Sequence, residues 1–149
     1  DVKKNDVPEI TKDGAKIKII CGEVDGVKGP VSDLFASPQY LDVALPPKGE
    51  VSLFVPEGFT AFLFVFEGAG VVGEGDVLTG KGGMVEFERT GEEVVVHGGD
   101  TGMRFLFVTG RPLGEPVAWY GPIVMNTQEE LQTAFQELQE GSFIKNRTP

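Results

Sequence analysis

A glycine-rich segment, one histidine and one cysteine are the parts of this sequence that could do chemistry. The segment Gly68-Ala69-Gly70-Val71-Val72-Gly73 has the spacing of a dinucleotide-binding loop and follows an apolar, strand-like stretch. Such a loop needs a following helix whose N-terminus binds the pyrophosphate. Residues 74–85 carry four glycines, and each glycine costs a helix about 1 kcal/mol. We therefore interpret the glycines as hairpin turns and predict no bound nucleotide.

His97 is the single histidine, and it could act as an acid-base group or as a lone metal ligand. A catalytic histidine needs an orienting partner, which the sequence does not reveal, so we predict a strand-end histidine at the surface. Cys21 shares the parity of Ile17 and Ile19, which favours core packing over reactivity. No Gly-x-Ser-x-Gly nucleophile elbow occurs. The sequence therefore predicts no catalytic residue in this chain.

Short apolar stretches separated by glycine and proline dominate the chain. The stretch 61–66 is apolar on both parities, so both of its faces should be shielded from water. One face can fill a barrel, and the other needs the C-terminal helix or a second protein surface as a cover. We predict about eight short strands and an all-β fold, an antiparallel β-barrel of the jelly-roll or cupin type with a C-terminal α-helix. The other expected strands are 16–21, 39–45, 50–55, 84–88, 93–97 and 104–108.

Helical periodicity appears in residues 128–140. Thr127 is the expected N-cap, Glu130 closes a capping box and Gly141 ends the helix. The expected apolar stripe of this helix consists of Leu131, Phe135 and Leu138.

Trp119 and Tyr120 lie before this helix in a connector bounded by proline and glycine, where no strand is expected. They could hold the connector on the barrel or contact a partner, since both residue types anchor loops and are enriched at interfaces. The residues considered for a partner surface are Trp119, Tyr120, Pro122, Met125 and Phe135.

Length and charge restrict the function further. We divide the 149 residues into a linker or N-terminal arm (1–15), a barrel (16–110) and a connector with helix (111–149) that completes the same domain. The net charge of −10 opposes direct nucleic-acid binding. No apolar run is long enough to span a membrane and no signal peptide is evident, so we expect a cytoplasmic protein. Because the first residue is Asp, we expect the chain to be processed or part of a longer protein.

Two C-terminal stretches resemble the signature of the pirin family: RPLGEPV at residues 111–117 and GPIVMNTQEEL at residues 121–131. The resemblance extends over most of the chain, from about residue 7 to residue 143. Further similar stretches, in order, are Lys12-Asp13-Gly14, Cys21-Gly22-Glu23, Gly29-Pro30-Val31, Pro38-Gln39-Tyr40-Leu41-Asp42 and Val55-Pro56-Glu57-Gly58-Phe59-Thr60.

Pirins have two cupin domains, and this chain resembles the second, metal-free one. The resemblance implies that iron is bound by three His and a Glu of an N-terminal domain, and that this chain holds no cofactor. Residues 64–70 resemble part of the first cupin motif, and counting from them places hydrocarbon side chains at the metal-ligand positions. The four vacant ligand positions are Phe54, Pro56, Ala61 and Val94. None of these side chains can coordinate a metal.

The resemblance implies a non-catalytic domain that packs on the metal-bearing N-terminal cupin domain. That domain would belong to the same pirin-like parent, which the resemblance links to iron-dependent quercetin dioxygenase activity or to a transcription-cofactor role. One alternative is a stand-alone protein-interaction module that uses the region from Trp119 to Phe135. A second alternative is a dioxygenase that acts only as a homo-oligomer, with His97 and carboxylates assembled from two copies.

Overall fold

The computed structural model describes residues 2–32, 34–73 and 77–145. The chain divides into two compact units, Asp1–Pro112 and Leu113–Pro149. This boundary lies two residues beyond the predicted end of the barrel at residue 110, and the completion of one domain by both units stays a prediction. Among the described residues, no helix has the length and apolar character needed to cross a bilayer.

The first unit consists of strands after one turn of 3₁₀ helix at Lys4–Asp6. The strands are β1 (Glu9–Lys12), β2 (Ala15–Cys21), β3 (Glu23–Val24), β4 (Val27–Lys28), β5 (Gln39–Leu45), β6 (Glu50–Phe54), β7 (Thr60–Val72), β8 (Val77–Gly80), β9 (Met84–Phe87) and β10 (Glu93–Gly110). The strands predicted at 16–21, 39–45 and 50–55 are confirmed within one residue at each end.

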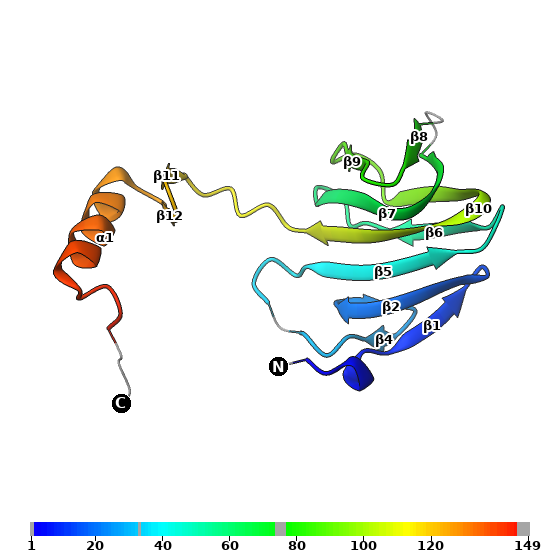
Figure 1. Cartoon of the computed structure of the whole chain (residues 1–149), viewed down its shortest axis with the longest axis horizontal. Helices are drawn as coiled ribbons and strands as arrows, with labels where there is room; N and C mark the ends of the chain where they lie inside the picture. The colour runs from blue at the N-terminus through cyan, green and yellow to red at the C-terminus, as the bar shows by residue number, and fades with distance from the viewer. Residues whose placement is uncertain (1, 33, 74–76, 146–149) are drawn as a thin grey trace. The chain divides into compact units, whose positions relative to one another are not determined.

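The two longest strands, β7 and β10, pair antiparallel along most of their length, from Thr60 opposite Gly110 to Val72 opposite Val96. The first half of β10 also pairs with β6, and its second half pairs with β5. In the same way, β9 pairs with the first half of β7 and β8 with the second half. Figure 1 shows β10 between β5 and β7. The continuous sheet therefore curves into a barrel, which confirms the predicted antiparallel barrel.

Glycine is required where the backbones of β7 and β10 approach each other most closely. A Cβ atom on Gly68 would lie 2.2 Å from the carbonyl oxygen of Gly102, and one on Gly70 would lie 2.2 Å from the carbonyl oxygen of His97. Both obstacles are backbone atoms, so a side chain at either position would push the strands apart. The prediction of hairpin turns is therefore wrong for Gly68 and Gly70, which lie inside β7, while Gly73 directly follows this strand.

Two other sequence predictions about extended segments are also wrong. The strands expected at 93–97 and 104–108 are parts of the single strand β10, with a register shift between Gly98 and Met103. The residues expected to form an arm, 1–15, include β1, which pairs with β2 and places Glu9 opposite Lys18. The sheet therefore begins earlier, and its central strand is longer, than the local pattern indicates.

The core of the first unit consists of inward-facing side chains from the barrel strands. Alternation along β2, β5, β7 and β10 directs every second side chain inward. Phe87 and Phe107 meet edge to face, with ring centroids 6.5 Å apart. The largest fully buried side chains are Phe105, Phe107, Ile17, Ile19, Leu41 and Leu63.

The second unit contains a hairpin of β11 (Ala118–Tyr120) and β12 (Ile123–Met125), followed by α1 (Gln128–Glu140). The predicted capping box is confirmed. The Glu130 amide donates to Thr127 Oγ1 at 3.1 Å, and the Thr127 amide donates to a Glu130 carboxylate oxygen at 3.0 Å. Gly141 ends α1 with a φ of 71°.

A small second core packs α1 against the hairpin. Its buried members are Ala118, Ile123, Leu131 and Ala134. The predicted stripe is wrong at its last position, because Leu138 is 51% exposed while Ala134 is 3% exposed.

Candidate functional site

A cavity of about 510 Å³ lies at one end of the barrel, and we call it the barrel cavity. The side chains at its floor are almost completely buried, with exposed fractions of 1–7%. They are Val55, Ala61, Val72 and Val94. The walls come from Phe59, Val85 and Phe87, which are half-buried. The floor and walls therefore present alkyl and phenyl groups, while Glu86, Glu88, Arg89, Thr90 and Glu93 complete the lining.

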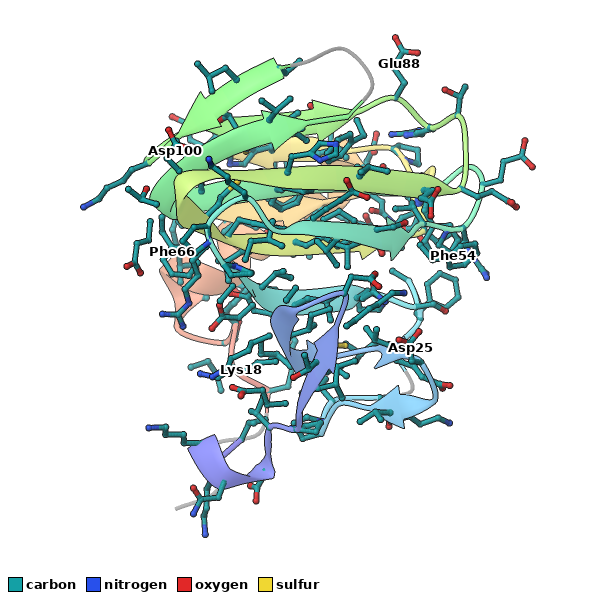
Figure 2. All side chains as sticks on the ribbon, turned by 90° about the vertical axis from the view of Figure 1, so that its right-hand side faces the viewer. Lys18, Asp25, Phe54, Phe66, Glu88 and Asp100 are labelled. Carbon is teal, nitrogen blue, oxygen red and sulfur yellow. The ribbon has the colours of Figure 1, made fainter. Side chains whose placement is uncertain are left out.

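Charged residues also line the barrel cavity, and the side chains of Glu86, Glu88 and Glu93 are directed away from its floor. Glu93 accepts a hydrogen bond from the Ser52 hydroxyl, and Ser52 has the outward parity of β6 because Val51 and Leu53 are buried. Alternation along β9 directs Glu86 away from the face of Val85. Figure 2 shows Glu88 directed away from the barrel.

The structure brings two of the four predicted ligand positions, Ala61 and Val94, to the floor of the barrel cavity. Phe54 is 61% exposed and lies at the outside of the barrel in Figure 2. Pro56 is half-buried and is not among the lining residues, whereas Val55 is. The placement of Phe54 and Pro56 in the barrel mouth is therefore wrong. A shift of one residue in a strand exchanges the two faces.

The lining of the barrel cavity does not fit the iron that the family resemblance implies for the other cupin domain of pirins. Iron sites of this type need imidazole and carboxylate donors, and the buried floor has alkyl groups instead. Across residues 2–32, 34–73 and 77–145, no three His, Cys, Asp or Glu side chains are grouped closely enough to hold a metal ion together. An iron ion at the floor would meet only alkyl side chains.

His97 lies within β10 rather than at a strand end, and it has a partner that the sequence did not reveal. Its Nδ1 is 3.0 Å from a carboxylate oxygen of Glu50, the residue opposite it on β6. The prediction of a surface position is confirmed, because the side chains of His97 and Glu50 are 48% and 63% exposed. Neither residue of this pair lines the barrel cavity.

Cys21 is 6% exposed, so the prediction of core packing is confirmed. Its Sγ lies 3.3 Å from the carbonyl oxygen of Pro38. Burial raises the pKa of the Cys21 thiol. Because the thiolate is the nucleophilic form, this cysteine is poorly reactive in the folded state.

A second apolar hollow, of about 670 Å³, lies on the outward face of the sheet, and we call it the outer groove. Strand pairing places its residues side by side, with Leu106 opposite Phe64 and Val108 opposite Phe62. Phe64 is 38% exposed and Met84, the residue opposite it on β9, is 64% exposed. The side chains that line the outer groove include Ile20, Tyr40, Phe62, Phe64, Leu106 and Val108.

An ion pair borders the outer groove on the same face of the sheet. Arg104 donates two hydrogen bonds to the Asp42 carboxylate, at 2.9 Å from Nε and 2.6 Å from Nη2. Its guanidinium carbon lies 4.9 Å from the centroid of the Phe66 ring. The hydrogen bond to Asp42 raises the pKa of Arg104. An arginine held beside an aromatic ring is common at protein interfaces, where both residue types are enriched.

The second unit has its own cavity, of about 430 Å³, between β11 and α1. Trp119 and Tyr120 lie in β11, so the prediction that they lie outside any strand is wrong. They are 72% and 71% exposed. The Trp119 indole donates to the carbonyl oxygen of Gly121 at 2.7 Å, and Tyr120 meets Phe135 edge to face at 5.5 Å.

The structure brings only part of the predicted partner surface together. Trp119, Tyr120 and Phe135 all line the cavity of the second unit. Met125 packs on the small core instead, and Pro122 is exposed and does not line the cavity. The sequence signal was the presence of large aromatic side chains, and the structure adds that α1 provides the facing wall.

Comparison with known proteins identifies relatives across the chain. The profile of the Pirin C-terminal cupin domain matches residues 40–144. A Thermoplasma acidophilum protein provisionally named quercetin 2,3-dioxygenase is 37% identical over 156 residues, which cover 99% of this chain and 59% of that protein. Human pirin is 33% identical over 140 residues, which cover 90% of this chain and 47% of pirin.

A solved structure agrees with these sequence relatives. The crystal structure of a quercetin 2,3-dioxygenase from Acinetobacter baumannii has a TM-score of 0.86 and 32% sequence identity, covering 96% of this chain and 49% of that one. The chain therefore spans about half the length of the relatives it matches. Because the family profile matches most of the residues, this chain belongs to the pirin family and has the fold of its C-terminal cupin domain.

Proposed function

We propose that this chain is a metal-free, non-catalytic cupin domain that binds a metal-bearing cupin domain of a pirin-like protein. The relatives extend well beyond the matched half, so there is room in them for a second domain of similar size. Two of them are named quercetin 2,3-dioxygenases. We assign such an iron-dependent dioxygenase activity to the assembled protein and the metal chemistry to the other domain.

The observation that carries the docking part of this proposal is the outer groove. Large apolar patches on a protein surface mark interaction sites when they are continuous and have a polar border. The outer groove is continuous across strands β2, β5, β10, β7 and β9, and the Arg104–Asp42 pair lies at its border. A second cupin domain would bury Phe64 and Met84, which water now reaches.

The donor chemistry of the barrel cavity supports the metal-free part of the proposal. Ala61 and Val94 lie on its floor, where metal-binding members of the fold would need imidazole or carboxylate groups. The His97–Glu50 pair offers two exposed groups that do not line the cavity.

Binding to a second cupin domain tests the docking surface. The probe is the part of the Thermoplasma acidophilum relative that this chain does not match, titrated calorimetrically with the 149-residue chain. Phe64→Asp places a charge in the outer groove, so we expect the affinity to fall at least tenfold. Leu78→Asp is the matched control, because Leu78 is 78% exposed on β8 and outside the groove. Equal affinities for both variants would reject the outer groove as the docking surface.

Elemental analysis of the purified chain tests the metal-free part separately. We expect less than one-tenth of an equivalent of iron, manganese, nickel or zinc after dialysis against a weak chelator. A stoichiometric transition metal that is lost on Ala61→Leu would contradict the proposal, because it would place the metal in the barrel cavity.

A second candidate function is a protein-interaction module based on the second unit. The observation that favours it is the pair Trp119 and Tyr120, which are highly exposed beside a cavity. A partner retained by the wild-type chain should be lost on Trp119→Ala. It should be retained on Leu138→Ala, which removes an exposed side chain of α1 outside that cavity. Unchanged binding by the Trp119 variant would remove this surface from consideration.

A further inference from the structure

We propose that the barrel cavity is a binding site for a small, uncharged and mostly apolar ring compound. This inference concerns the inside of the barrel and does not depend on what covers the outer groove. The barrel cavity has a volume of about 510 Å³, which falls within the range of about 300–1,000 Å³ that is common for small-molecule sites.

The floor of the barrel cavity is rigid and already formed. Ala61, Val72 and Val94 belong to the paired strands β7 and β10, and they are 1–7% exposed. The wall residue Phe87 is held edge to face against the buried Phe107. Because these groups are fixed by the core behind them, a ligand would not have to order the site on binding.

The lining decides the chemical class of the ligand. The floor and walls offer phenyl rings from Phe59 and Phe87 and methyl groups from Val85 and the floor residues. Flat aromatic rings pack well on such groups. A charge or a buried hydroxyl would lose its hydration without gaining a partner there. Water at the floor of the cavity also lacks hydrogen-bond partners, so an apolar molecule displaces it favourably.

Polar atoms of a ligand could be accommodated only at the mouth, where the exposed residues Glu88, Arg89 and Thr90 border the cavity. A molecule with hydroxyl groups distributed around its rings cannot direct all of them to the mouth. Quercetin is such a molecule, and relatives of this chain are named for acting on it. The barrel cavity should therefore prefer an unsubstituted ring system to quercetin.

The first experiment titrates the 149-residue chain with N-phenyl-1-naphthylamine, an uncharged fluorescent ring compound. We expect saturable 1:1 binding, at least tenfold tighter than the binding of quercetin in a competition assay. Ala61→Leu fills the floor of the cavity and should weaken binding at least tenfold. Phe64→Ala, on the opposite face of the same strand, should change the affinity less than twofold. The absence of saturable binding, or tighter binding of quercetin, would overturn the proposal.

A second measurement does not depend on the folding of any variant. In methyl NMR spectra of the wild-type chain, the probe should shift the signals of Val55, Val72, Val85 and Val94. Shifts confined to Ile20, Leu106 and Val108 would place the probe in the outer groove and would overturn the proposal. Failure of the domain-binding experiment above would leave both of these measurements unaffected.

Discussion

The two faces of β7 have nearly the same apolar character and very different surroundings. On the inward face, Ala61, Leu63 and Val65 are 2%, 0% and 0% exposed. On the outward face, Phe64 is 38% exposed, while Phe62 and Phe66 are half-buried. The inward face is completed by the fold itself, and the outward face forms part of the outer groove.

This difference shows how apolar content can serve two purposes in one strand. A run that is apolar on both parities is typical of a strand covered on both sides. In the first unit, the barrel core supplies one cover, and Phe64 on the other side remains open to water. Stability should therefore depend on the inward residues, and association should depend on the outward ones. The predictions below test that division.

Leu63→Ala should produce the largest loss of stability. Leu63 is fully buried in the main core, and removing a buried leucine side chain costs about 2–5 kcal/mol because a cavity remains. The measurement is the free energy of unfolding from urea denaturation. A loss below about 1 kcal/mol would mean that the inward face contributes less than its burial indicates.

Phe64→Ala, one residue further along, should cost much less in the isolated chain. Its side chain remains partly in water, so we expect a loss of about 1 kcal/mol or less under the same conditions. The same variant should bind the second cupin domain more weakly. A loss equal to that of Leu63→Ala would contradict the comparison, since it would show that the outward face is already covered.

Arg104→Ala should have a smaller effect on stability, of about 0–1 kcal/mol, because its side chain is 38% exposed and water screens the ion pair. Asp42 raises the pKa of Arg104, so the contribution is fully present at neutral pH. It would be lost only as the pH rises through that raised pKa. Arg104→Met retains an apolar stem over Phe66 and should recover part of the loss. Equal losses of stability in Arg104→Ala and Arg104→Met would show that only the charge of Arg104 contributes.

Cys21→Ala should have the smallest effect on the free energy of unfolding, and that effect should appear only in alkaline solution. Burial raises the pKa of the Cys21 thiol above its ordinary value of 9.0. Between the pKa of the thiol in the unfolded state and its raised pKa in the folded state, the folded protein therefore keeps a proton that the unfolded protein releases. Stability should therefore fall with rising pH above about 9, and more steeply than in Cys21→Ala. Identical pH profiles of unfolding for the two proteins would show that the thiol is not coupled to folding.

The sequence pattern correctly predicted those helices and strands whose bounds depend on neighbouring residues. Thr127, Glu130 and Gly141 define the bounds of α1 because capping depends on neighbours within one turn of the helix. The bounds of β5 were also correct, since its residues alternate cleanly between proline-containing segments. The continuity of β10 was missed, because Gly98, Gly99 and Gly102 resemble a turn until β7 is placed beside them.

The candidate site was only partly predictable. Counting from the cupin-like motif found Ala61 and Val94, but it placed Phe54 inside the barrel, where Val55 actually lies. The error is a single residue, which in a strand is enough to exchange inside and outside. The partner of His97 was missed for another reason, since Glu50 lies 47 positions away and only strand pairing brings it close.

The sequence by itself determined the strand periods, the caps of α1, the apolar character of β7 and the lack of metal donors at Ala61 and Val94. These properties depend on residue types and on spacings of a few positions. The tertiary structure decided which apolar residues enclose the barrel cavity, which ones form the outer groove, and that Arg104 meets Asp42. Such choices depend on pairing between strands that are distant in the chain, where register selects the face that each side chain occupies.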